Sequence, residues 1–441
     1  MNNFKKKRIL FIENRDKTSF WVKVAKTLEL MDCEIHFLVQ SPYFSPKNIK
    51  NVHVIKIPNK KAINQAKGDE PTELTEYLLS RDRGAKYFCS GISHYGYYYN
   101  EINTVLNNIA PDLVIGECTL FHELMTCFIC KKLNISYIHP AGSRYPPGRF
   151  QIFMSDSQEV AISSNDSWSN ESMDAFILSV NSGNIRPEYM AKANSLRAIF
   201  RYKFLRFFYW IKVSISNFFG EKYNTPTIKR KFVLTYKLSK TLKEWDRSSS
   251  LPTSKKNILY PMQMQPEANI DVWGSKYSDQ AILIKKIASM LPPDFNLIVK
   301  ANPKPKYELL DITKVVMSSQ NIYLAPRHMN MTDLEKNIHG IITVTGTVGF
   351  ESIFKASNCI SLGHPMIEEK FSKYSANSLK DAIFKLIHFK PDIYDDNPKK
   401  LLKNLIKDSF DGVVGDPLYS PHAQAQENIY KIAKKIYKCL I

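Results

Sequence analysis

The sequence predicts an α/β protein with two Rossmann-like domains facing a cleft. Short runs rich in Ile and Val alternate with longer helical patterns, and this order occurs in both halves of the 441-residue chain. Runs that are apolar throughout are typical of parallel strands that helices cover on both faces. A polar, turn-rich stretch between the halves, DRSSSLPTSKKN, is predicted as the linker.

The predicted strands follow the same pattern in each half. They span residues 8–13, 34–40, 52–57, 112–117 and 135–140, and then 257–263, 295–302, 322–326, 340–345 and 359–363. Open α/β sheets bind ligands outside the carboxyl ends of their strands. Two such sheets therefore predict a ligand cleft between the two sets of strand ends.

The predicted domain boundaries follow from the linker. An N-terminal domain of residues 1–245 carries a less regular, basic insertion at about 150–235, and a second domain spans 255–422. A last helix at 423–441 has Ile429, Ile432, Ile436 and Leu440 near helical spacing. We expect this helix to pack back across the domains.

The insertion contains an aromatic helix without acidic residues. Phe200, Phe204, Phe207, Phe208 and Ile211 form one helical stripe, and residues 189–220 hold six basic residues. A basic amphipathic helix with aromatics is typical of a membrane interface. A core helix with a solvated basic face explains the same pattern. We favour the core helix.

Charge and cysteine content limit the function classes. The net charge of +19 favours an anionic partner, but no zinc-finger spacing or RNP-type motif indicates nucleic acid. The seven scattered cysteines form no disulfide framework. The apolar run near the N-terminus is too short for a signal peptide, and no run is long enough to span a bilayer. We expect a cytoplasmic protein, with the inner-membrane surface as a further partner.

The stretch VTGTVGFES indicates a phosphate site. Thr345, Gly346 and Thr347 connect a predicted strand to a helix, so their N–H groups and the helix dipole suit an anion. Glu351 in that helix is placed to accept hydrogen bonds from ribose hydroxyls. The alternative is a tight turn in which Glu351 only offsets the helix dipole.

Other strand ends of the second half also carry polar side chains. Gln265 and Glu267 follow one strand, Lys300 and Asn302 end another, and His364 follows a third. Carboxyl ends of parallel strands share one sheet edge, so these groups are expected to converge on one ligand. Lys300 is a natural countercharge for a phosphate, and the alternative is a solvated surface lysine.

At this point the chain resembles a known family. The order QPEA…DQ…LP…VKANP…VTGTVGFES…G, mainly within residues 257–365, is similar to the capsular-polysaccharide biosynthesis family of bacterial glycosyltransferases, which includes enzymes that transfer Kdo from CMP-Kdo. The resemblance implies a GT-B fold whose C-terminal domain holds the nucleotide-sugar. It also implies a donor site lined by Gln265, Glu267, Lys300, Asn302, Thr345, Gly346, Thr347 and Glu351.

Two departures from the family pattern concern mechanism. Where the family shows Lys-x-His-Pro, this chain has KANP, with Asn302 in place of the histidine. Where retaining Kdo transferases show an EDGF-R-like segment, this chain has PAGS-R, with Ala141 in place of the nucleophile. A covalent intermediate on that residue is therefore impossible. Either another carboxylate such as Glu117 serves, or a base assists direct displacement.

The first half supplies candidate catalytic groups at strand ends. Glu117, in GECTLFHE, is the best-placed carboxylate for activating an acceptor hydroxyl. His139, Arg144 and Arg149, in YIHPAGSRYPPGRF, are candidates for binding a phosphate or an acidic sugar. In the alternative interpretation Glu117 or Glu123 caps a helix and the arginines close a loop.

We therefore expect a glycosyltransferase that moves a sugar from a nucleotide donor to a capsule, lipopolysaccharide or lipid-linked acceptor. No acidic DxD-type pair lies near the donor motifs, so no metal ion and no cofactor beyond the donor are expected. The alternatives are a UDP-sugar-using transferase, a nucleotide-sugar epimerase, a polyol-phosphate transferase, or a non-catalytic glycan- or lipid-binding protein.

Overall fold

A computed structural model describes residues 6–185, 187, 196–252, 255–310, 312, 315, 319–368, 371–389, 397–417 and 420–440. The chain forms two compact units. Unit 1 comprises Met1–Trp168, Arg186–Ile228 and Leu402–Ile441, and unit 2 comprises Ser169–Ile185 and Lys229–Leu401. The chain thus passes between units several times, whereas the sequence predicted one linker. The predicted linker, residues 246–257, lies inside unit 2.

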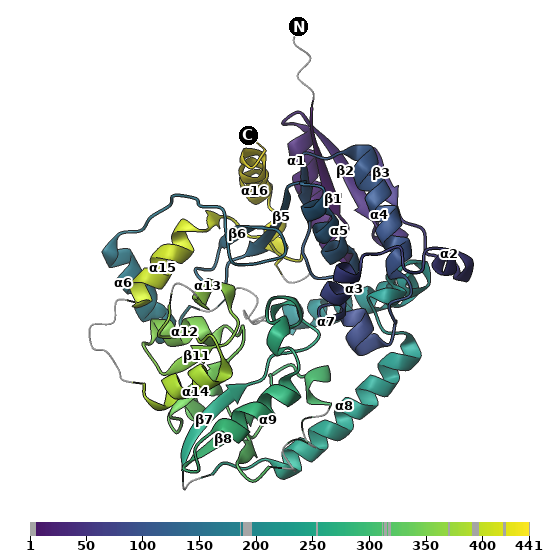
Figure 1. The fold of residues 1–441 in the computed structure, drawn as a ribbon. Coiled ribbons are helices and arrows are strands. Elements are labelled where there is room, and N and C mark those ends of the chain that lie inside the picture. The colour runs from purple at the N-terminus through teal and green to yellow at the C-terminus, as the bar shows by residue number, and fades with distance from the viewer. Residues whose placement is uncertain are drawn as a thin grey trace. The chain divides into compact units, whose positions relative to one another are not determined.

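Unit 1 contains a seven-stranded sheet in the order β12-β6-β5-β4-β1-β2-β3 (Figure 1). Its strands are β1 (Lys7–Ile12), β2 (Cys33–Val39), β3 (Asn51–Val54), β4 (Leu113–Ile115), β5 (Tyr137–Gly142), β6 (Arg149–Met154) and β12 (Phe410–Asp411). Strands β1 to β5 are parallel and match the five strands predicted for the first half. The antiparallel edge strands β6 and β12 were not predicted.

Helices accompany this sheet in unit 1. They are α1 (Thr18–Glu29), α2 (Lys60–Gln65), α3 (Thr72–Leu79), α4 (Tyr95–Ile109), α5 (Phe121–Lys132), α7 (Leu196–Ser216) and α16 (Gln426–Lys438). The last of them, α16, packs beside α1 (Figure 1). Its buried Ile429, Ile432 and Ile436 join the apolar core that includes Phe20 and Val24 of α1. The helix predicted at the C-terminus therefore completes the core of unit 1.

Unit 2 contains a five-stranded parallel sheet in the order β11-β10-β7-β8-β9. The strands are β7 (Lys256–Pro261), β8 (Phe295–Lys300), β9 (Ile322–Leu324), β10 (Gly340–Thr343) and β11 (Cys359–Ser361). The accompanying helices are α6 (Asn170–Asn181), α8 (Ile228–Ser248), α9 (Gln280–Met290), α11 (Met331–Glu335), α12 (Val348–Phe354), α13 (Pro365–Glu368) and α14 (Leu379–Ile387). Helix α15 (Asn397–Lys407) crosses the boundary between the units after Leu401. The prediction of an α/β protein with two Rossmann-like domains is confirmed.

In both sheets the strand order reverses once. The reversal lies between β1 and β4 in unit 1 and between β7 and β10 in unit 2. Loops leave the two central strands in opposite directions at such a point, which opens a crevice at the carboxyl edge where α/β proteins bind ligands. Among the described residues, no helix is long and apolar enough to cross a membrane.

Candidate functional site

Lys300 is the most distinctive side chain at the carboxyl edge of the unit 2 sheet. It is the last residue of β8 and only 6% exposed. Its ammonium group has no hydrogen bond or ion pair to any residue within the described ranges. Burial lowers the pKa of Lys300, and no carboxylate in the described ranges offsets that effect. A lysine with so little exposure and no countercharge among the described residues is costly, so this position is suited to an anionic ligand.

The loop that follows β7 is held by Gln280, the first residue of α9. Its amide oxygen accepts hydrogen bonds from the Tyr260 hydroxyl at 3.0 Å and from the Gln263 N–H at 2.9 Å. Its amide nitrogen donates to the Gln263 carbonyl at 2.7 Å and to the Gln265 side chain at 2.9 Å. Gln280, from the DQ pair of the sequence motif, is therefore a positioning residue for this loop.

Gln265 was predicted to bind the donor, but its side chain is used within the loop. The amide nitrogen donates to Asp271 Oδ1 and to the Ser278 carbonyl, both at 2.8 Å, while Gln280 occupies the oxygen. The side chain is also buried. The amide therefore shapes the loop through these bonds, and its contact with a donor stays a prediction.

The turn after β10 also differs from the expectation. The Gln263 side chain is oriented so that both its amide oxygen and its amide nitrogen have partners. In this orientation Oε1 accepts from the N–H groups of Thr345 at 2.8 Å and Gly346 at 2.5 Å. The Thr345 hydroxyl donates to the Asn269 carbonyl at 2.8 Å. The predicted phosphate-binding amides of Thr345 and Gly346 are thus already occupied, and α12 has only seven residues. Gly346 is needed because a Cβ there would lie 2.6 Å from the Thr343 hydroxyl.

Four other predicted donor residues lie at the same sheet edge. Asn302 accepts a hydrogen bond from the Lys304 N–H at 2.9 Å, which shapes the turn after β8. Glu267, Thr347 and Glu351 are partly exposed in the loop after β7 and around the start of α12. Their contact with a nucleotide stays a prediction. His364, after β11, is buried against Phe350, with ring centroids 4.6 Å apart.

In unit 1, Glu117 lies at the switch point between β1 and β4. Its carboxylate accepts hydrogen bonds from Lys17 Nζ at 2.6 Å and from Trp21 Nε1 at 2.9 Å. Both partners come from the segment that follows β1, and all three side chains are largely shielded from solvent. Glu117 caps no helix. The buried ion pair with Lys17 instead keeps a carboxylate at the sheet edge.

His139 lies on β5, beside β4, and is buried. Burial lowers its pKa to about 4, although Glu117 acts in the opposite direction. The ring is therefore neutral near pH 7, and its contact with a phosphate or an acidic sugar stays a prediction. Arg144 is partly exposed in the turn between β5 and β6, where its binding role stays a prediction.

Glu123 and Arg149 have structural roles. The Glu123 carboxylate accepts from the N–H groups of Thr119 and Leu120, each at 3.0 Å, at the start of α5. Arg149 is buried and donates to Asp166 at 2.5 Å and to the Ser409 carbonyl at 2.6 Å. Arg149 thus ties β6 to the C-terminal segment, as the loop-closing alternative proposed.

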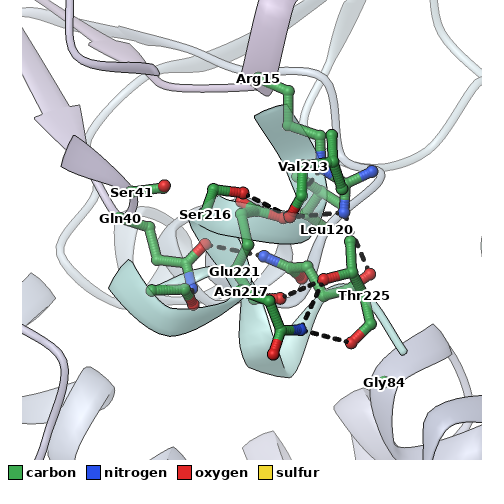
Figure 2. Close-up of polar contacts among 12 residues, drawn as sticks. Arg15, Gln40, Ser41, Gly84, Leu120, Val213, Ser216, Asn217, Glu221 and Thr225 are labelled. Atoms are coloured by element: carbon green, nitrogen blue, oxygen red, sulfur yellow. Dashed lines mark hydrogen bonds and ion pairs between the residues drawn. The ribbon is translucent and has the colours of Figure 1, made fainter. Parts of the chain in front are cut away.

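A polar cluster not predicted from the sequence closes the other part of this sheet edge (Figure 2). Arg15, after β1, lies 2.9 Å from Glu221 Oε2, and Gln40, after β2, hydrogen-bonds to the Gly220 carbonyl and to Asn224. The segment that follows α7 therefore covers the ends of β1 and β2.

The cluster contains a carboxyl group with an unusual pKa. Glu13 is fully buried, and burial, followed by the nearby Glu221 carboxylate, raises its pKa to about 8. The folded state therefore retains a proton that the unfolded state loses near about pH 4.3, so the free energy of unfolding falls as pH rises through this window, by at most about 1.4 kcal/mol per pH unit. Glu13→Gln should flatten that slope in urea unfolding between about pH 5 and about pH 9.

The exposed carboxylate of Glu29 provides the control for this measurement. Glu29→Gln should keep the wild-type slope because that group is already hydrated in the folded state. Equal slopes for wild type and Glu13→Gln would contradict the assignment of the titration to Glu13.

Comparison with known proteins confirms the family resemblance. Residues 197–370, which include the donor motifs, match the family model described as capsule polysaccharide biosynthesis protein. No curated protein sequence matches the chain.

In the described part of the chain, no three His, Cys, Asp or Glu side chains gather as metal ligands would.

Solved structures with similar folds are distant. UDP-GlcNAc 2-epimerase from Methanocaldococcus jannaschii is 14% identical, with 98% of this chain and 99% of that chain covered and a TM-score of 0.24. The same enzyme from Neisseria meningitidis, bound to UDP-GlcNAc, is 13% identical over 98% and 99%, with a TM-score of 0.24. The calicheamicin glycosyltransferase CalG4 is 10% identical over 99% and 98%, with a TM-score of 0.28. With TM-scores this low, the fold assignment stands on the two sheets themselves.

Proposed function

We propose that the protein is a glycosyltransferase of capsule polysaccharide biosynthesis that binds its nucleotide-sugar donor at the carboxyl edge of the unit 2 sheet. The observation that carries this proposal is Lys300, an almost fully buried lysine at the end of β8 whose ammonium has no countercharge among the described residues. A donor phosphate supplies that charge. The family match over residues 197–370 supports the sugar-transfer class.

The proposed reaction uses Lys300 electrostatically. When the bond between the sugar's anomeric carbon and the phosphate oxygen breaks, negative charge develops on the leaving phosphate. Lys300 stabilises that charge in a site where water screens it little. The acceptor hydroxyl forms the new bond, and its proton passes to Glu117 as general base. Ala141 carries no nucleophile, so we favour direct displacement over a covalent intermediate.

The donor is proposed to be an acidic sugar carried by CMP, such as CMP-Kdo, with a surface polysaccharide or lipid-linked glycan as acceptor. This part rests on the resemblance of residues 257–365 to a family that includes Kdo-transferring enzymes, although KANP and PAGS-R depart from the family pattern. Asn302 stands where the family has a histidine. Its side-chain amide can donate a hydrogen bond to the phosphate or carboxylate of such a donor, but it carries no charge.

A thermal-shift series with CMP, UDP, GDP and their sugar conjugates tests the proposal, since a ligand that binds only the folded state raises the melting temperature. Stabilisation by one nucleotide, followed by sugar transfer to a glycan acceptor, is the expected result. Conversion of the nucleotide-sugar without an acceptor would instead indicate an epimerase. Failure of every nucleotide to stabilise the protein would overturn the proposal.

A further inference from the structure

Large apolar side chains of α7 lie in solvent. Phe204, Phe207 and Phe208 are each more than half exposed, and Phe218 and Phe219, which follow the helix, are exposed as well. The rings of Phe204 and Phe208 contact each other, with centroids 4.7 Å apart. The core helix favoured from the sequence is therefore wrong for these residues. Phe200 lies among side chains outside the described set.

Helix α8 has two distinct faces. Leu234 and Trp245 are buried, and Trp245 belongs to the apolar core of unit 2. On the opposite face Phe232 is 70% exposed and Tyr236 is 74% exposed, with Val233 beside them. The other side of α8 anchors the helix, and no described residue of unit 2 covers this exposed face.

The exposed face of α8 also carries cations. At 3.6 residues per turn, Lys229, Lys240 and Lys243 fall on the same side of the helix as Phe232 and Tyr236. All three lysines are exposed. Residues 229–243 contain six Lys or Arg and no Asp or Glu, and residues 189–220, around α7, have the same imbalance.

Aromatic side chains and lysines on one exposed helix face match the surface of an anionic bilayer. The rings enter the boundary between headgroups and acyl chains, while the lysines meet lipid phosphates. A second copy of this chain is a poor occupant, because it would bring another net charge of +19 against a basic face. Single exposed apolar residues are ordinary, but runs on two successive helices are not.

We propose that α7 and α8 are interfacial anchors that dock the protein on anionic lipid membranes. Phe204, Phe207 and Phe208 insert from α7, and Phe232 and Tyr236 insert from α8. Each helix is an anchor in its own right, and stable attachment generally requires more than one such contact. This inference does not depend on the proposed sugar transfer.

Vesicle co-sedimentation of the full chain tests the proposal. The protein should bind phosphatidylcholine vesicles that contain phosphatidylglycerol much more tightly than pure phosphatidylcholine. Binding should weaken between about 0.1 M and about 1 M salt, where the screening length falls from about 10 Å to about 3 Å. Phe204→Ser with Phe207→Ser, and Phe232→Ser with Tyr236→Ser, should each reduce the partition coefficient by roughly tenfold or more.

Control variants distinguish binding through α7 and α8 from nonspecific adsorption by other exposed apolar side chains. Leu30→Ser and Leu178→Ser change residues that are 89% and 71% exposed on other elements, and they should bind like wild type. Lys240→Glu with Lys243→Glu should abolish the preference for anionic vesicles. Absence of wild-type binding, equal binding by the aromatic variants, or a doubled mass in solution that those variants reverse would each overturn the proposal.

Discussion

Replacing Lys300 with methionine is expected to weaken nucleotide binding by about 30-fold or more, and to raise the free energy of unfolding of the ligand-free protein. The loss follows because removing one partner of a buried charge pair costs about 2–5 kcal/mol of binding free energy. The gain follows because methionine fills the same space without an uncompensated charge, by about 1 kcal/mol. Titration calorimetry and urea unfolding measure the two effects.

A loss of nucleotide affinity together with a gain in the free energy of unfolding distinguishes a ligand-binding lysine from a structural one. Lys256 begins β7 at the amino edge of the same sheet and is exposed, so Lys256→Met should leave nucleotide affinity unchanged. Unchanged affinity in Lys300→Met would contradict the donor-site assignment. Loss of several kcal/mol of stability in the ligand-free variant would show that Lys300 serves the fold instead.

The parallel strands could be predicted from the sequence because their apolar runs are short, continuous and separated by helices. Strands β6 and β12 could not, since β12 has two residues and both pair antiparallel at the sheet edge. The unit boundaries also depend on contacts distant in sequence. Residues 402–441 join unit 1 because α16 packs on α1, and nothing local in the C-terminal sequence indicates that choice.

The candidate site shows a similar limit. Strand ends could be located, so Lys300 and Glu117 were found at the sheet edges. Whether a polar side chain faces a ligand or its own loop depends on its partners in space. Gln263 and Gln280 therefore could not be recognised as loop-holding residues, although Gln280 belongs to the quoted motif. The neutral state of His139 likewise depends on burial that the sequence does not report.

The described phenylalanine side chains of α7 were expected to be buried in a core, but they are exposed. A stripe at helical spacing normally packs into a core, which made the core helix the reasonable expectation. The pattern alone does not say which side of a helix meets the protein. In α8 the buried face is set by Leu234 and Trp245, and the equally apolar Phe232 is left outside.

Glu117→Gln is expected to reduce the rate of sugar transfer by about 10²- to 10⁴-fold, the range typical for loss of a general base. Donor binding should persist, because Lys300 belongs to the other unit. Glutamine keeps the shape and can still accept a hydrogen bond from Trp21, but it cannot take the acceptor's proton. Single-turnover kinetics with saturating donor, alongside the melting temperature, measure the two quantities.

The ion pair with Lys17 makes a structural role for Glu117 the main competing explanation. Removing one partner of a buried pair destabilises a protein by about 3–5 kcal/mol when the other is left without a countercharge. Lys17 keeps some exposure, with 18% of its side chain accessible, so hydration offsets part of that cost. Trp21→Phe is the matched variant, since it removes the other hydrogen bond to the carboxylate and leaves the carboxylate itself. A base that acts chemically predicts a far larger rate loss in Glu117→Gln than in Trp21→Phe, whereas equal losses that track stability would assign Glu117 to the fold.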